Sequence, residues 1–183
     1  NYAFNRATTE KITFIWGPPG TGKTETLSNI AIEHILKGRR VLMLSYSNVS
    51  VDGALLRVAK KADLPGGMVI RYGYPRTKEL VYSKNLTSYQ FVLQKYPSLA
   101  QEYQELLEKK KKLKRRSTER LEINNRINKI RDYLSEQEKE LIHRSAFVAT
   151  TVSKATVDKA IYTQRFDVVI FDEASMAYVP QVI

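Results

Sequence analysis

The sequence predicts an α/β domain with a mostly parallel sheet, interrupted by a long helical insertion. Short apolar, β-branched runs alternate with amphipathic stretches in residues 1–73 and again in 146–183. This alternation is typical of parallel strands joined by crossover helices. Between the two segments, residues 88–142 contain no glycine and no strand pattern. A glycine-rich loop with the spacing of a phosphate-binding loop follows the first apolar run.

The individual elements follow from periodicity and from turn residues. Residues 12–16 are apolar, β-branched or aromatic and precede a Gly-Pro-Pro-Gly turn, so we expect a buried strand there. A helical pattern runs from Lys23 to Leu36, and Gly38 is placed to end it. Further strands are expected over 41–44, 68–71, 146–150 and 167–171, and further helices over 51–61 and from 153.

The insertion contains two apolar seams with the spacing of coiled coils. They are Leu99, Tyr103, Leu106, Lys110 and Leu113, then Ile123, Ile127, Ile130, Leu134, Gln137 and Leu141. Their heptad phases differ, and a turn between Lys114 and Leu121 would explain the change of phase. One straight helix over 97–144 would be about 72 Å long at ~1.5 Å per residue, yet the chain must return to the sheet. We therefore expect an inserted antiparallel helical hairpin within residues 74–145.

Charge and composition indicate the kind of binding partner and exclude some classes of protein. The formal net charge is +11, which suggests a polyanionic partner such as nucleic acid. Seven of the eight residues 109–116 are basic, so most of this excess is one local run near the expected hairpin tip. That run is either a nucleic-acid contact or a solvated tip. The lack of cysteine excludes disulfides and thiolate catalysis, and no apolar run is long enough for a membrane span. We expect a cytoplasmic or nuclear protein.

The glycine-rich loop satisfies the full G-x-x-x-x-G-K-(S/T) spacing of a Walker A motif. Its prolines cannot donate hydrogen bonds, so the phosphate cradle must come from later amides at the start of a helix. Lys23 is expected to reach the β- and γ-phosphates of ATP, and the Thr24 hydroxyl to ligate Mg²⁺. The candidate ATP-binding residues are Gly17, Pro18, Pro19, Gly20, Thr21, Gly22, Lys23, Thr24 and Glu25.

A second candidate motif is the apolar strand over 167–171, which ends in two adjacent carboxylates. Asp172 is placed to hold Mg²⁺ through the water shell of the metal, so Thr24 and Asp172 are the candidate metal residues. Glu173 is placed to orient or deprotonate the attacking water. A solvated acidic turn is the alternative, and the accompanying phosphate loop disfavours it. The candidate catalytic residues are Lys23, Asp172 and Glu173.

Four stretches together resemble the first RecA-like domain of superfamily 1 helicases. The branch is the one that contains the nonsense-mediated-decay RNA helicase and the immunoglobulin-mu-binding helicase. Residues 16–24 resemble its motif I, 41–52 its motif Ia, 147–151 its threonine-bearing strand and 166–175 its motif II. The resemblance implies a P-loop RecA-like core over 1–73 and 146–183, and ATP-driven translocation on single-stranded DNA or RNA. The nucleic-acid contacts it implies are Ser47, Asn48, Thr150 and Thr151.

Residues 1–183 depart from the family pattern in some respects. The adenine-contacting glutamine motif expected upstream of motif I is not visible, since residues 1–6 look like the tail of its helix, and Met176 stands where many relatives have glutamine. A second RecA-like domain is expected downstream in the same protein, so residues 1–183 alone should bind ATP with little turnover. An AAA-class ATPase is an alternative, although the 149 positions from Lys23 to Asp172 exceed that class's usual gap. A nucleotide-gated interaction module with the hairpin as docking arm also stays open, as does the choice between DNA and RNA.

Overall fold

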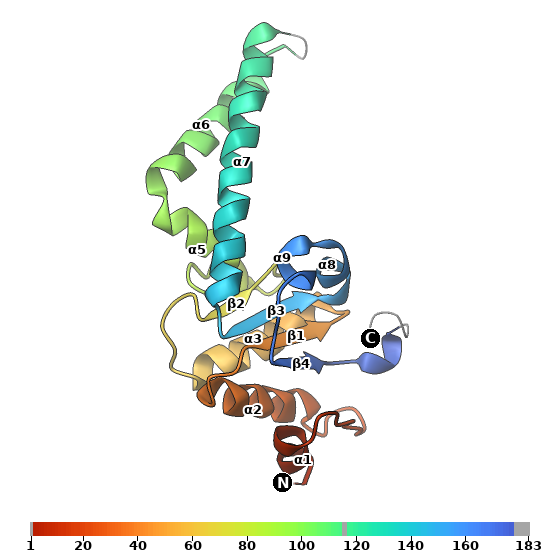
Figure 1. Ribbon diagram of the computed structural model, residues 1–183. Coiled ribbons are helices and arrows are strands. Elements are labelled where there is room, and N and C mark those ends of the chain that lie inside the picture. Colours follow the sequence, from red (N-terminus) through yellow and green to blue (C-terminus); the bar gives the residue numbers. More distant parts are fainter. Residues whose placement is uncertain (1, 115–116, 178–183) are drawn as a thin grey trace.

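A four-stranded, all-parallel sheet forms the centre of the protein (Figure 1). The computed structural model describes residues 2–114 and 117–177. The strands are β1 (Val41–Ser45), β2 (Val69–Arg71), β3 (Phe147–Thr151) and β4 (Val168–Phe171), in the order β2-β3-β1-β4. In register, Val41 lies between Phe147 and Val168. The predicted α/β fold, with a parallel RecA-like sheet flanked by helices, is confirmed.

The two faces of the sheet are covered by different helices. On one face, α2 (Lys23–Leu36) and α3 (Asn48–Lys61) bury side chains such as Ile30 and Leu55 against Met43 and Phe147. The short α1 (Tyr2–Thr9) packs on α2. On the other face, α8 (Val152–Val157) and α9 (Lys159–Tyr162) contribute to a second apolar cluster that contains Leu42, Leu44 and Val148. Successive side chains of β1 thus pack on opposite faces of the sheet, as strand geometry requires.

The predicted boundaries of the first two long helices can be compared directly with the structure. Helix α2 has the predicted bounds, and Gly38 adopts the left-handed conformation expected after a helix end, with a φ of 73°. Helix α3 begins at Asn48, three residues earlier than predicted. Its N-cap is Ser47, whose Oγ accepts a hydrogen bond from the Ser50 backbone amide at 3.4 Å. The cap therefore moves the helix start to the carboxyl end of β1.

The expectation of a buried strand over residues 12–16 is wrong. The segment is irregular and pairs with no strand among the described residues. Phe14 and Trp16 are 91% and 89% exposed, although their side chains are apolar. Strand β4 is an edge of the described sheet, and Val169 on it is itself exposed. Without a paired neighbour and a facing layer, an apolar β-type sequence gains neither ladder hydrogen bonds nor burial.

The insertion is helical throughout its regular parts. It comprises α4 (Lys78–Val81), α5 (Ser88–Lys95), α6 (Pro97–Lys112) and α7 (Thr118–Arg144). Helix α6 leads away from the sheet and α7 returns to it alongside α6, so the predicted antiparallel hairpin is present (Figure 1). The apolar members of both predicted seams meet in one cluster, and an ion pair joins Arg126 Nε to Glu102 Oε1 at 2.6 Å. The same cluster includes Ile70 of β2, so the base of the hairpin packs on the sheet.

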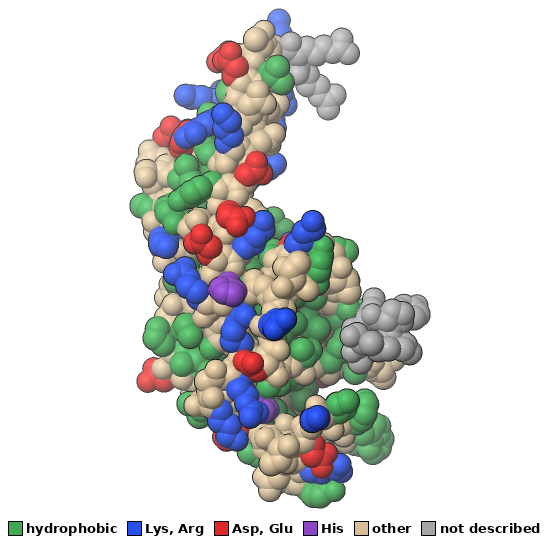
Figure 2. Space-filling view, viewed as in Figure 1, with side chains coloured by type: hydrophobic (Ala, Val, Ile, Leu, Met, Phe, Trp, Pro, Cys, Tyr) green, Lys and Arg blue, Asp and Glu red, His purple; other side chains and the backbone are tan. Residues whose placement is uncertain are grey.

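The basic run lies at the far end of this hairpin. Residues 109–112 form the last turn of α6, and Arg115 and Arg116 lie outside the described residues. Lys111 pairs with Glu108 at 2.6 Å. Figure 2 shows acidic side chains interspersed with the lysines and arginines along the visible face of the hairpin. None of the helices in the described part of the chain has the length and apolar character that crossing a membrane requires.

Candidate functional site

The glycine-rich loop between residue 16 and α2 has the backbone geometry of a phosphate cradle. Gly20 and Gly22 have φ values of 80° and 83°, a left-handed conformation that other residues adopt only with strain. The loop closes on itself, because Thr21 Oγ1 donates to the Pro18 carbonyl at 2.8 Å. A Cβ atom on Gly17 would lie 2.8 Å from that hydroxyl oxygen. Glycine therefore avoids backbone strain at positions 20 and 22 and leaves room for the Thr21 hydroxyl at position 17.

The start of α2 offers unpaired donors to this loop. Within the described residues, the backbone amides of Gly22, Lys23 and Thr24 donate to no acceptor of the protein. They lie at the N-terminus of a 14-residue helix, where the aligned peptide dipoles favour an anion. These amides and the side chain of Lys23 together could bind the phosphates of a nucleotide.

The Lys23 ammonium group lies over the same loop. Its Nζ donates to the carbonyl oxygens of Gly17 and Pro18 at 2.6 Å and 2.9 Å. Both acceptors are neutral, so phosphate oxygens would be stronger partners for the charged donor. The Lys23 ammonium group is therefore held beside the loop that is predicted to bind the phosphates of ATP.

The two predicted metal residues come together although 148 positions separate them. Thr24 Oγ1 lies 3.5 Å from Asp172 Oδ2. The end of β4 is fixed in place, because the Asp172 amide donates to the Leu44 carbonyl of β1 at 2.8 Å. Burial raises the pKa of the Asp172 carboxyl, and the charge of Glu173 raises it further. The hydrogen bond from the Glu173 backbone amide, then the hydrogen bond to Thr24 and the charge of Lys23, lower this pKa, as a bound cation would.

Glu173 is turned toward β1 and α3. Its backbone is left-handed, with a φ of 60°, which is an unfavourable conformation for a residue with a side chain. Its two carboxylate oxygens accept hydrogen bonds from Ser45 Oγ at 3.2 Å and from Ser50 Oγ at 3.4 Å. The sequence analysis missed both serines. What could have pointed to them is their position, at the end of β1 and in the first turn of α3. That position suggests contact with Glu173 only when it is known that β1 lies next to β4 in the sheet.

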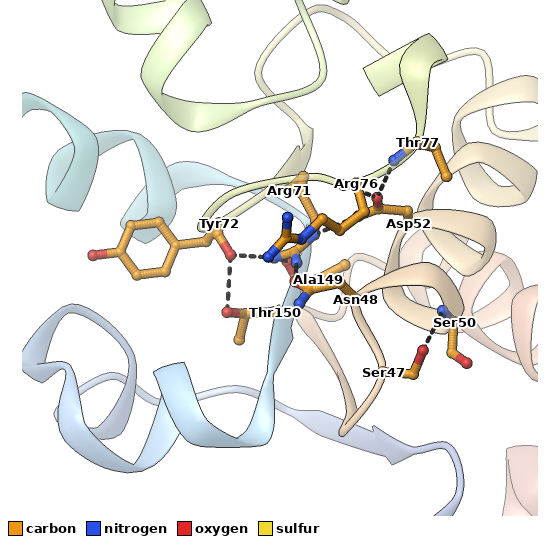
Figure 3. A network of polar contacts seen from close by, with 10 residues as sticks. All are labelled: Ser47, Asn48, Ser50, Asp52, Arg71, Tyr72, Arg76, Thr77, Ala149 and Thr150. Atoms are coloured by element: carbon orange, nitrogen blue, oxygen red, sulfur yellow. Dashed lines mark hydrogen bonds and ion pairs between the residues drawn. The ribbon is translucent and has the colours of Figure 1, made fainter. Parts of the chain in front are cut away.

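The four candidate nucleic-acid residues lie at the carboxyl ends of the adjacent strands β1 and β3: Ser47 and Asn48 follow β1, and Thr150 and Thr151 are the last two residues of β3. Ser47 and Thr151 are N-caps, of α3 and of α8. The Asn48 Oδ1 atom accepts a hydrogen bond from Arg71, and the Thr150 hydroxyl donates to the Tyr72 carbonyl at 2.9 Å (Figure 3). Thr150 is completely buried, whereas the other three are partly exposed. Of the four, Thr150 is therefore the one whose side chain does not reach the surface.

Comparisons with known proteins identify the family of the chain. The model of a family described as an AAA domain matches residues 1–183. DNA polymerase alpha-associated DNA helicase A of Saccharomyces cerevisiae is 33% identical over 98% of this chain. DNA-binding protein SMUBP-2 of Rattus norvegicus is 30% identical over 92%, and ATP-dependent helicase upf1 of Schizosaccharomyces pombe is 30% identical over 93%.

The chain spans only part of each relative, namely 28% of the Saccharomyces cerevisiae protein and 18% of each of the other two. The description of the family is broad, but the names of these relatives are those of helicases and of a DNA-binding protein. They agree with the four motifs that the sequence contains. The chain therefore belongs to this AAA domain family, in the superfamily 1 branch that contains the nonsense-mediated-decay RNA helicase and the immunoglobulin-mu-binding helicase.

Proposed function

We propose that this chain is the ATP-binding motor domain of a helicase that couples ATP hydrolysis to translocation on single-stranded DNA or RNA. The observation that carries the proposal is the approach of Thr24 to Asp172, because it brings the loop predicted to bind phosphates next to the carboxylate predicted to hold Mg²⁺. In this proposal, residues 1–73 and 146–183 form the RecA-like core and 74–145 the inserted hairpin. A second RecA-like domain of the same protein completes the site, and the intact protein works in the cytoplasm or nucleus.

The residues of the site divide the chemistry of hydrolysis among them. Lys23 and the unpaired amides at the start of α2 would bind the phosphates of ATP. Thr24 and Asp172 would hold Mg²⁺, which neutralises phosphate charge when it is bound. Glu173 would orient the attacking water and accept its proton. Its contacts with Ser45 and Ser50 keep that carboxylate at the edge of the sheet where the other groups lie.

The polar residues at the carboxyl ends of β1 and β3 would contact the sugar-phosphate backbone of the single-stranded nucleic acid. Hydroxyl and amide groups position phosphates without reading sequence, which suits a translocating enzyme. Ser47, Asn48 and Thr151 would make these contacts with their side chains. Thr150 would contribute by fixing the backbone at Tyr72, because its own hydroxyl is buried in that hydrogen bond.

The experiment that tests this function is a steady-state ATPase assay on the intact protein. Turnover is measured without nucleic acid, with single-stranded poly(dT) and with poly(U), and Lys23→Ala is the negative control. We expect stimulation by at least one strand and no turnover in the variant. A rate that neither strand changes would contradict translocation, and full turnover in Lys23→Ala would contradict the site itself. The stronger of the two stimulations identifies the preferred nucleic acid.

The basic run at the hairpin tip gives a separate prediction. If all seven basic residues of 109–116 contact phosphates of a single strand, they contribute about −5 to the log–log salt dependence of binding, from ~0.7 per contact. Replacing these residues with glutamine should then flatten the slope measured by fluorescence anisotropy. An unchanged slope and affinity would show that the run is a solvated tip.

A further inference from the structure

Asp52 and Arg71 form a buried ion pair, and Arg71 also contacts Asn48 (Figure 3). Arg71 Nε lies 2.8 Å from Asp52 Oδ1, and the two side chains are 1% and 0% exposed. The second carboxylate oxygen of Asp52 accepts the backbone amides of Arg76 and Thr77 at 2.6 Å and 2.9 Å. The guanidinium group also donates to the carbonyl of Tyr72. Arg71 is thus held from several sides and has little freedom to rotate.

The second terminal nitrogen of Arg71, Nη2, fixes the orientation of the Asn48 side-chain amide. Arg71 Nη2 lies 2.7 Å from Asn48 Oδ1. A guanidinium group can only donate, so the amide oxygen must face it and the Nδ2 group must face away. Among the described residues, none accepts a hydrogen bond from Nδ2. Asn48 is partly exposed and is the first residue of α3, at the carboxyl end of β1.

We propose that Arg71 is a positioning residue for nucleic-acid binding, which fixes the Asn48 amide so that its Nδ2 group donates to a phosphate oxygen of the strand. The inference rests on the proposed function, because it requires that the chain bind single-stranded nucleic acid. Phosphate oxygens are acceptors only, so a fixed pair of N–H donors has the right polarity for them. The N-terminus of the 14-residue α3 adds a favourable field for an anion.

Arg71 acts through Asn48 because it cannot reach the strand itself. Its side chain is 1% exposed, and its donors are used by Asp52, Asn48 and backbone carbonyls. A merely structural role for Arg71 would change stability and affinity together. A positioning role instead makes the effect of Arg71 on affinity depend on the presence of the Asn48 amide.

A double-mutant cycle in the intact protein separates these roles. The cycle compares wild type, Arg71→Lys, Asn48→Ala and the double variant for binding of a single-stranded oligonucleotide, with melting temperatures measured alongside. Lysine keeps a positive charge beside Asp52 but loses the fork that reaches Asn48. Each single change should weaken binding about tenfold, the value for one hydrogen bond to a charged group. The double variant should bind no more weakly than the weaker single variant.

Equal losses from Arg71→Lys in both backgrounds would overturn the inference, since Arg71 would then act without Asn48. Unchanged affinity in Asn48→Ala would overturn it as well. Absence of binding by the wild-type protein is a different outcome, because it would contradict the proposed function and remove the inference with it.

The Asn48→Asp variant tests the polarity directly and does not depend on how well Arg71→Lys folds. The substituted carboxylate still accepts from Arg71, and a negative charge is favourable at the first turn of a helix. Toward the strand, however, it replaces donors with an anionic acceptor. We expect a melting temperature no lower than that of wild type, together with weaker binding than Asn48→Ala shows. Binding as tight as wild type would contradict the assignment of Nδ2 as the contacting group.

Discussion

Replacing Glu173 with glutamine should lower the rate of ATP hydrolysis by the intact protein about 10²- to 10⁴-fold, the usual contribution of a general base. An amide cannot take up the proton of the attacking water. Affinity for Mg·ATP should persist, because the phosphates are assigned to Lys23 and to the amides at the start of α2. The amide oxygen of the substituted side chain can still accept from one of the two serines, and the hydroxyl of the other can accept from the new amide nitrogen, so the local fold should be kept.

The measurement pairs steady-state turnover with a nucleotide titration of the same preparations. Glu122→Gln is a matched control, because it makes the same chemical change at an exposed position of α7. The control should behave as wild type in both assays. Turnover by Glu173→Gln within a factor of about two of wild type would show that another group activates the water, given the size expected of a general base.

Replacing Asp52 with alanine should lower the free energy of unfolding by about 3–5 kcal/mol, the cost of removing one partner from a buried ion pair. The Arg71 guanidinium would stay in the interior without its counter-charge, and two backbone amides would lose their acceptor. Burial already lowers the pKa of Arg71, and the hydrogen bond to Asp52 offsets this effect. The loss of Asp52 therefore removes the main compensation for a desolvated cation.

Equilibrium unfolding in urea measures this loss. Asp132→Ala is the control, since Asp132 is an exposed carboxylate on α7, and its removal should change stability by no more than about 0.5 kcal/mol. A loss below about 1 kcal/mol in Asp52→Ala would mean that water reaches the pair and that its desolvation is small.

Much of the fold could be predicted from the sequence, because for these elements the spacing of apolar residues and the capping residues are enough to define the helix and its buried face. Helix α2 is amphipathic and ends at a glycine, so its bounds follow from periodicity and capping alone. The hairpin was predictable because its two seams are out of phase, which required a turn between them. Segment 12–16 has the composition of a buried strand, but burial depends on neighbouring strands, and local composition does not report these.

The candidate site was predictable only in part, for a similar reason. Lys23, Thr24, Asp172 and Glu173 belong to contiguous motifs, so the sequence predicts them as candidates without knowledge of the fold. The partners of Glu173 and of Asn48 come from other elements and depend on strand order. Ser45 reaches Glu173 because β1 adjoins β4, and Arg71 reaches Asn48 from β2. Neither serine nor arginine carries a local sequence signal for such a role.

The central claim is that the loop before α2 binds the phosphates of ATP, and calorimetric titration of Mg·ATP into wild-type and Lys23→Ala protein tests it most directly. Lys23 is the one side chain in this loop that carries a positive charge, so its removal should abolish measurable binding. Circular dichroism and melting temperature should show that the variant remains folded. Equal affinity of the two proteins for Mg·ATP would contradict the claim, because the nucleotide would then bind elsewhere.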